Sequence, residues 1–228
     1  MAIHFPNVPA TYRNIPKTGT TSFKWWARDN IKDCIILEDP KRIYNMQHLT
    51  LDEIKSKWPT YGTTFTFVRN PFDRMVSIFH HVGQDAEARL KQRPFGGTKE
   101  QYGVRQEELD SIPIEIDIKI LQVYKKGFDH WIHTTVPEYK FNDSLNLLLY
   151  QKDSQLTWLN NVIPDIVIKI EEIDSRFKML QDLLGCDVPF PHINTSVHKN
   201  YREYYNASSI KLVEEMFSDD LNTFNYEF

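Results

Sequence analysis

The side chains best suited to chemistry in this chain lie in one short, threonine-rich run near its beginning. Residues 11–15 predict a strand that leads into the run, and residues 20–29 predict a helix that follows it. At such a helix start the backbone N–H groups point outward and the helix dipole adds positive potential, so the junction predicts an anion-binding site. The run consists of Pro16, Lys17, Thr18, Gly19, Thr20, Thr21 and Ser22.

Each residue type in this run contributes to binding an anion. Gly19 lets the backbone approach a phosphate closely, the hydroxyls are hydrogen-bond donors, and Lys17 adds a mobile positive charge. In the ATP-binding loop, Gly-x4-Gly-Lys-Ser/Thr, the lysine follows the second glycine. Here Lys17 precedes Gly19 and the chain contains no Gly-x4-Gly-Lys sequence, so the loop is not of the ATP type. Taken alone, the run also fits a strand–turn–helix with an incidental lysine.

An arginine at the end of another predicted strand is the second candidate anion ligand. Residues 64–68 are β-branched or aromatic, as in a buried strand, and Arg69 follows them. Asn70 and Pro71 are typical of a helix start, and the predicted helix, to about residue 82, carries Ser77. Open α/β sheets bind ligands at the carboxyl ends of their strands, and a guanidinium can bind two phosphate oxygens at once. The position of Arg69 therefore predicts a phosphate ligand.

A general base needs a pKa near the working pH, which makes histidine the first candidate. The chain has eight histidines, and His48 stands just before a predicted helix at residues 51–58, 21 residues ahead of Arg69. His130 and His133 flank Trp131 in an aromatic segment and are the alternatives, or they pack in the core. We expect His4 to precede the first strand, and His80 to complement a helix C-terminus.

Short apolar runs alternate with helical patterns, which predicts a three-layer α/β fold with a central parallel sheet flanked by helices. We expect residues 1–228 to form one domain. Residues 84–112 are charged and lack apolar periodicity, which favours a lid or a mobile insertion. Further strands are predicted at 34–37 and 165–170, and further helices at 114–126, 175–184 (ending at Gly185) and 208–217.

Composition narrows the class of protein. The chain has 228 residues, 41% of them hydrophobic, which is ordinary for a folded domain. Its net charge of −4 argues against a nucleic-acid partner. No run approaches the ~20 apolar residues of a membrane span, and the N-terminus lacks the pattern of a signal peptide. Cys34 and Cys186 match no metal-ligand spacing. We expect a cytoplasmic protein that requires no metal.

Two motifs together resemble the nucleotide site of sulfotransferases that use 3′-phosphoadenosine 5′-phosphosulfate (PAPS). Residues 15–22, Ile-Pro-Lys-Thr-Gly-Thr-Thr-Ser, resemble the family's 5′-phosphosulfate loop, and residues 67–77, Phe-Val-Arg-Asn-Pro-Phe-Asp-Arg-Met-Val-Ser, resemble its 3′-phosphate motif. Residues 194–196, 201–205 and 224–228 are similar to the end of the carbohydrate (uronyl-2-O-like) branch. The resemblance implies a P-loop-like fold, PAPS as sulfate donor and adenosine 3′,5′-bisphosphate (PAP) as product.

The resemblance also implies roles for individual residues. Lys17 would stabilise the departing phosphate, while Arg69 and Ser77 would hold the 3′-phosphate. His48 occupies the place of a catalytic histidine that lies in a His-x-Thr segment in that branch. Lys199 and Arg202 would close over the 3′-phosphate, or else are solvated surface charges.

The acceptor is less defined by the sequence. Residues 149–155 resemble the family's glutamine-containing acceptor-side stretch but lack the histidine often found there. The acceptor would be a hydroxyl of a glycan, a lipid or a small metabolite, in a cytoplasmic enzyme of the bacterial or viral type. A small-molecule kinase on a related scaffold and a non-catalytic module that binds an anionic glycan or nucleotide are the alternative functions.

Overall fold

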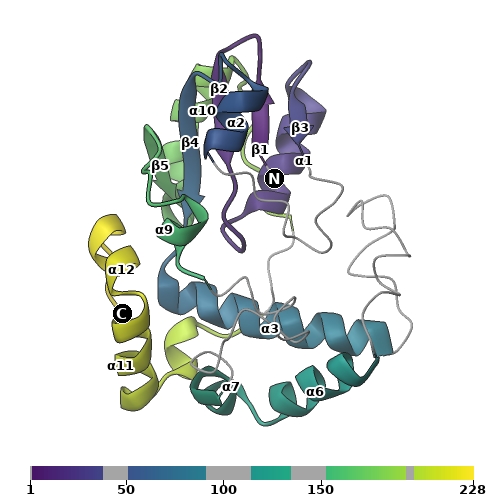
Figure 1. Cartoon of the computed structure of the whole chain (residues 1–228), viewed down its shortest axis with the longest axis vertical. Coiled ribbons are helices and arrows are strands. Elements are labelled where there is room, and N and C mark those ends of the chain that lie inside the picture. Colours follow the sequence, from purple (N-terminus) through teal and green to yellow (C-terminus); the bar gives the residue numbers. More distant parts are fainter. Residues whose placement is uncertain (1, 38–50, 91–113, 135–152, 194–197) are drawn as a thin grey trace. The chain divides into compact units, whose positions relative to one another are not determined.

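The computed structural model describes residues 2–37, 51–90, 114–134, 153–193 and 198–228 (Figure 1). The chain divides into two compact units, each described here by itself. The first contains residues 1–70, 153–195 and 219–227, and the second contains residues 71–152, 196–218 and Phe228. Within the described ranges, no helix is both long and apolar enough to cross a membrane. The single domain over residues 1–228 stays a prediction.

A five-stranded sheet in the order β3-β1-β2-β4-β5 forms the centre of the first unit. The parallel pairs β2–β4 and β4–β5 confirm the predicted α/β class. The sheet is mixed, however, because β1 pairs antiparallel with both β2 and β3. Only four residues join β1 to β2, and so short a connection permits a hairpin but no parallel crossover. The strands are β1 (Ala2–Phe5), β2 (Ala10–Arg13), β3 (Ile35–Leu37), β4 (Thr63–Val68) and β5 (Ile166–Lys169).

Strand β1 overturns one expectation. His4 lies inside this strand and not before the first one, and it is 3% exposed. Its Nδ1 lies 3.0 Å from the Thr11 hydroxyl, and its ring stacks on Trp58 at 4.7 Å between centroids. A mainly apolar run of four residues is too short for the sequence alone to identify it as a strand.

Helices cover both faces of this sheet, which gives the three layers. Helices α1 (Thr20–Asn30) and α10 (Ile173–Leu184) pack with Phe65 and Phe67 of β4 on one face. On the other face, Val68 packs with Leu159, just after α9 (Gln155–Trp158), and with Phe224 of α12 (Ser218–Phe224). Helix α2 (Leu51–Lys57) packs through Ile54 onto Ala2. Helix α10 ends at Gly185, as predicted, with a left-handed φ of 68°.

An aromatic cluster fixes the start of α1 against the sheet. The ring of Phe23, which is fully buried, lies 4.6 Å from that of Tyr12, 5.6 Å from Phe65 and 5.2 Å from Phe67. Such aromatic pairs add stability beyond the area that they bury. Because Phe23 lies one turn into α1, this packing positions the loop that precedes the helix.

The second unit is helical. Helix α3 (Pro71–Leu90) packs against α6 (Ile114–Lys125), and α7 (Phe128–Thr134), the 3-10 helix η3 (Tyr201–Tyr204) and α11 (Ala207–Met216) complete it. Trp131 is 3% exposed and its ring lies 5.5 Å from that of Phe79, so it is a core residue. Helix α12 after α11 was not expected from the sequence.

Helix α3 is longer than the sequence predicts. It continues through Gly83, where an added Cβ would lie 2.2 Å from the Tyr124 ring of α6. Gly83 therefore allows close packing of the two helices, although in the sequence it reads as a helix end. Residues 84–90 of the predicted lid are helical, and residues 91–113 lie outside the described part of the chain.

Candidate functional site

The loop between β2 and α1 has a strained, closely held backbone. Lys17 and Gly19 both have left-handed conformations, with φ of 68° and 84°. The first backbone bond of α1 runs from Phe23 N–H to the Gly19 carbonyl, over 3.1 Å. The N–H groups of the three residues between them consequently have no acceptor within the helix. The helix start thus presents the donors that an anion site requires.

Three hydroxyls of the loop are hydrogen-bonded to neighbouring parts of the chain. Thr18 donates to the Ile15 carbonyl over 2.8 Å, Ser22 donates to the Ile193 carbonyl over 2.8 Å, and Thr20 bonds Asn14. These three hydroxyls hold the loop in place. Their contact with an anion stays a prediction, and the backbone N–H groups of the same residues are further candidate donors.

Gly19 is required at its position for two reasons. Its φ of 84° is unfavourable for residues with a side chain, and an added Cβ would lie 2.7 Å from Ile170 Cδ1 and 3.6 Å from Phe190 Cζ. The loop thus passes directly over the segment that follows β5. A glycine at this point lets the backbone approach both its neighbours and a ligand.

Arg69 connects the two predicted motifs. It follows the last residue of β4, and its Nη1 donates to the backbone carbonyl of Lys17 over 3.2 Å. The guanidinium is partly buried. An arginine at the carboxyl end of a parallel strand, in contact with the loop at the end of the neighbouring strand, lies where this class of sheet binds ligands.

The backbone at Arg69 is held by the side chain of Gln155. The Arg69 N–H donates to Gln155 Oε1, and Gln155 Nε2 donates to the Arg69 carbonyl, both over 2.9 Å. Gln155 is fully buried. The sequence placed it in a stretch resembling an acceptor-side segment, but its amide is bonded to Arg69. Residues 149–152 of that stretch lie outside the described part of the chain.

The backbone of Asn70, the residue after Arg69, is bound by a carboxylate that follows β5. Glu171 accepts from the Asn70 N–H over 2.7 Å and from the Tyr226 hydroxyl over 2.8 Å. Burial and the nearby charge of Glu171 raise the pKa of Tyr226, so this hydroxyl stays a donor. Lys169 Nζ donates to the Asn225 carbonyl over 2.8 Å. Sequence reasoning missed this network, although Glu171 follows a predicted strand at the same sheet edge.

The other predicted phosphate ligands belong to the second unit. Ser77 is 2% exposed in α3. Lys199 and Arg202 are exposed on the surface of that unit; Lys199 pairs with Glu203 at 3.7 Å, and the Arg202 guanidinium lies 5.6 Å from the Phe228 ring centroid. Their assignment to the same site as Arg69 stays a prediction.

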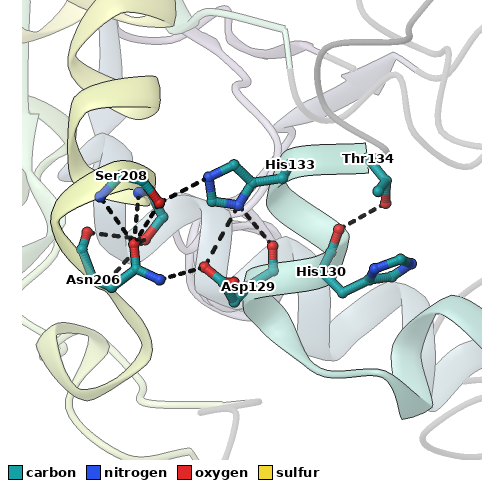
Figure 2. Close-up of polar contacts among 7 residues, drawn as sticks. Asp129, His130, His133, Thr134, Asn206 and Ser208 are labelled. Atoms are coloured by element: carbon teal, nitrogen blue, oxygen red, sulfur yellow. Dashed lines mark hydrogen bonds and ion pairs between the residues drawn. The ribbon is translucent and has the colours of Figure 1, made fainter.

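The histidine predicted as the base, His48, lies outside the described residues. Of the alternatives, His133 connects α7 to the start of α11 (Figure 2). Its Nδ1 donates to the Asp129 carbonyl over 2.9 Å, and its Nε2 lies 3.2 Å from the Ser208 hydroxyl. Ser208 also bonds Asn206, the residue that caps α11. These contacts give His133 a structural role in holding two helices together.

Two other histidines of the second unit, His130 and His80, differ in environment. His130 is partly exposed on α7, and its carbonyl accepts from Thr134 over 2.7 Å (Figure 2). His80 lies within α3 and not at its end, because the helix continues to Leu90. Its Nε2 lies 2.9 Å from the Tyr204 hydroxyl. Burial and the charge of His198 lower the pKa of His80, so it is neutral near pH 7.

No cluster of three or more histidine, cysteine, aspartate or glutamate residues that could hold a metal occurs within the described ranges.

A family model described as "Sulfotransferase family" matches residues 5–227. The match includes the loop, Arg69, Gln155 and Glu171. The sequence matches no curated protein and no solved structure.

Proposed function

This chain belongs to the sulfotransferase family, and we propose that it transfers the sulfuryl group of PAPS to an acceptor hydroxyl. The observation that supports this donor most directly is the bond from the Arg69 guanidinium to the Lys17 carbonyl. It brings the candidate ligand of the 3′-phosphate next to the loop that would hold the 5′-phosphosulfate. Both features lie at the carboxyl ends of adjacent parallel strands, β2 and β4.

In the proposed reaction, the acceptor oxygen bonds to sulfur while the bond from sulfur to the 5′-phosphate oxygen breaks. The N–H groups at the start of α1 and the Lys17 ammonium would stabilise the charge that develops on this oxygen. The hydroxyl proton would pass to His48. Arg69, Ser77, Lys199 and Arg202 would hold the 3′-phosphate, which PAPS has and ATP lacks. This chemistry requires no metal.

We further propose a carbohydrate acceptor. The proposal depends on the resemblance of residues 194–196, 201–205 and 224–228 to the carbohydrate branch of the family. Lipid and small-metabolite hydroxyls are the alternatives that an acceptor panel would separate.

Calorimetry and a transfer assay test the function. We expect PAPS and PAP to bind without metal and more tightly than ATP with Mg²⁺, and we expect PAP to be released only when an acceptor is present. The Lys17→Ala variant is the catalytic control. Equal binding of PAPS and ATP would contradict the donor, and phosphoryl transfer from ATP would indicate a kinase. Donor binding without PAP release, for any sugar, lipid or small hydroxyl compound, would indicate a binding module.

A further inference from the structure

The backbone just after β4 is hydrogen-bonded by side chains from distant parts of the chain. Three successive backbone groups are bonded there: the N–H of Arg69, the carbonyl of Arg69 and the N–H of Asn70. Gln155 bonds the first two and Glu171 bonds the third. Gln155 is 86 residues from Arg69 and Glu171 is 101 residues from Asn70, so tertiary folding alone fixes the backbone at the end of β4.

Gln155 is itself rigidly held. Its backbone N–H donates to Asp220 Oδ2 over 2.7 Å, and the N–H of Leu156 donates to Asp220 Oδ1 over 3.0 Å. Gln155 and Asp220 are both fully buried. Hydrogen bonds shielded from water are stronger, and an unpaired buried polar group is unfavourable, so this arrangement strongly prefers one geometry.

The consequence for Arg69 follows from its contact with the loop. Gln155 bonds both the backbone N–H and the backbone carbonyl of Arg69. The Arg69 guanidinium donates to the Lys17 carbonyl. A guanidinium that binds phosphate through two parallel N–H bonds depends on its orientation more than a lysine does. A displacement of the Arg69 backbone would therefore misdirect the guanidinium while leaving its charge unchanged.

We propose that Gln155 is a positioning residue for donor binding. Its buried amide holds the backbone of Arg69, and it thereby sets the preference of the site for nucleotides that carry a 3′-phosphate. This inference rests on the proposed function, because it needs Arg69 to bind that phosphate.

The test compares the affinities of PAP and adenosine 5′-phosphate, which differ only in the 3′-phosphate. Gln155→Glu retains an oxygen for the Arg69 N–H but loses the donor to the Arg69 carbonyl. We expect this variant to bind PAP about tenfold more weakly, the effect of impairing a hydrogen bond to a charged group. Its affinity for adenosine 5′-phosphate should stay unchanged. The matched control is Gln181→Glu. It removes the hydrogen bond that the Gln181 side-chain amide donates to the Val188 carbonyl, elsewhere in the same unit.

A merely structural role would lower the stability of the protein and leave the ratio of the two affinities intact. Combining Gln155→Glu with Arg69→Ala separates the two roles further. If Gln155 acts through Arg69, then Gln155→Glu causes no additional loss of PAP affinity in the Arg69→Ala background. An additive loss would contradict the proposal.

The outcomes distinguish this inference from the proposed function. A wild-type protein that binds the two nucleotides equally would refute the 3′-phosphate site itself. A wild-type protein that prefers PAP, with the same preference in Gln155→Glu, would refute the role of Gln155 alone. If Gln155→Glu does not fold, Asp220→Asn provides the same measurement. It replaces the carboxylate that accepts from the backbone N–H of Gln155 by an amide, and so weakens the bonds that hold Gln155. We then expect a smaller loss of the preference for PAP, and an unchanged preference would refute the inference.

Discussion

The Arg69 guanidinium donates to the backbone carbonyl of Lys17 across 3.2 Å, which connects the end of β4 to the loop after β2. A guanidinium carries five N–H donors in a fixed plane, so one arginine can contact both a carbonyl and an anion. A lysine has no such fork. Arg69 of the second motif therefore lies against the loop of the first, and changes at Arg69 should affect that loop.

Replacing Arg69 by lysine keeps the positive charge and removes the planar set of N–H donors. We expect Arg69→Lys to bind PAP about tenfold more weakly and Arg69→Ala to bind it more weakly still, because charge-assisted hydrogen bonds are lost in both. Titration calorimetry measures the change. Arg28→Lys is the control, since Arg28 is exposed on α1 and lies over the Trp25 ring. Wild-type affinity in Arg69→Ala would exclude Arg69 from the site.

Two replacements of Lys17 separate the effect of its backbone conformation from the effect of its charge. Lys17 has a φ of 68°, which glycine adopts without strain and alanine does not. We expect Lys17→Gly and Lys17→Ala to lower kcat equally, by about 100-fold or more, as for the loss of a group that stabilises transition-state charge. Lys17→Gly should nevertheless be the more stable of the two in urea. Unequal kcat values would show that loop conformation, and not the ammonium, limits turnover.

Two glycines with similar backbones differ in their surroundings. Gly19→Ala would place a Cβ 2.7 Å from Ile170 Cδ1, whereas at Gly185, with a φ of 68°, nothing lies within 4 Å of an added Cβ. We expect Gly185→Ala to lower the free energy of unfolding by about 1–2 kcal/mol through backbone strain alone. Gly19→Ala should lower it further. Equal losses in urea denaturation would mean that Ile170 moves aside at no cost.

Replacing His48 tests the proposed base. We expect His48→Ala to lower kcat about 100-fold or more, the usual effect of losing a general base, with PAP affinity unchanged. His133→Ala and His130→Ala are the comparison variants. His133→Ala should retain turnover but unfold at a lower urea concentration, because His133 connects α7 to α11. A large loss of kcat in either comparison variant, with normal turnover in His48→Ala, would transfer the role to it.

The buried His4 should make stability depend on pH. Burial lowers the pKa of His4 in the folded protein below its ordinary value, so the unfolded chain binds the proton more readily. The free energy of unfolding should consequently fall as the pH drops below about 6.5 and continue to fall until the lower folded pKa is passed. We expect a smaller fall in His4→Asn between about pH 7.5 and about pH 5.5, the range in which histidine titrates. His80, whose pKa is also lowered, accounts for part of the remainder. An unchanged pH dependence in His4→Asn would contradict the prediction.

Local sequence patterns predicted most of the individual elements. The loop before α1, the strand ending at Val68 and the helix beginning at Pro71 are set by neighbouring residues: a glycine with positive φ, a β-branched run, and a proline at the first helical position. The order of residues along the chain likewise predicted two phosphate-binding motifs and argued against an ATP-type loop. These are short-range properties, which a sequence displays directly.

Tertiary structure alone decided how those elements are held. No spacing in the sequence indicates that Gln155 bonds both sides of Arg69, or that Glu171 joins Asn70 to Tyr226, because each pair is separated by 50 residues or more. It also turned the loop hydroxyls inward, since a buried hydroxyl must find an acceptor and the Ile15 and Ile193 carbonyls lie within reach. The sequence by itself determined which charged and polar groups this protein carries at the proposed anion site. The packing of distant segments around β4 decided where they point, because it fixes backbone atoms that no local pattern constrains.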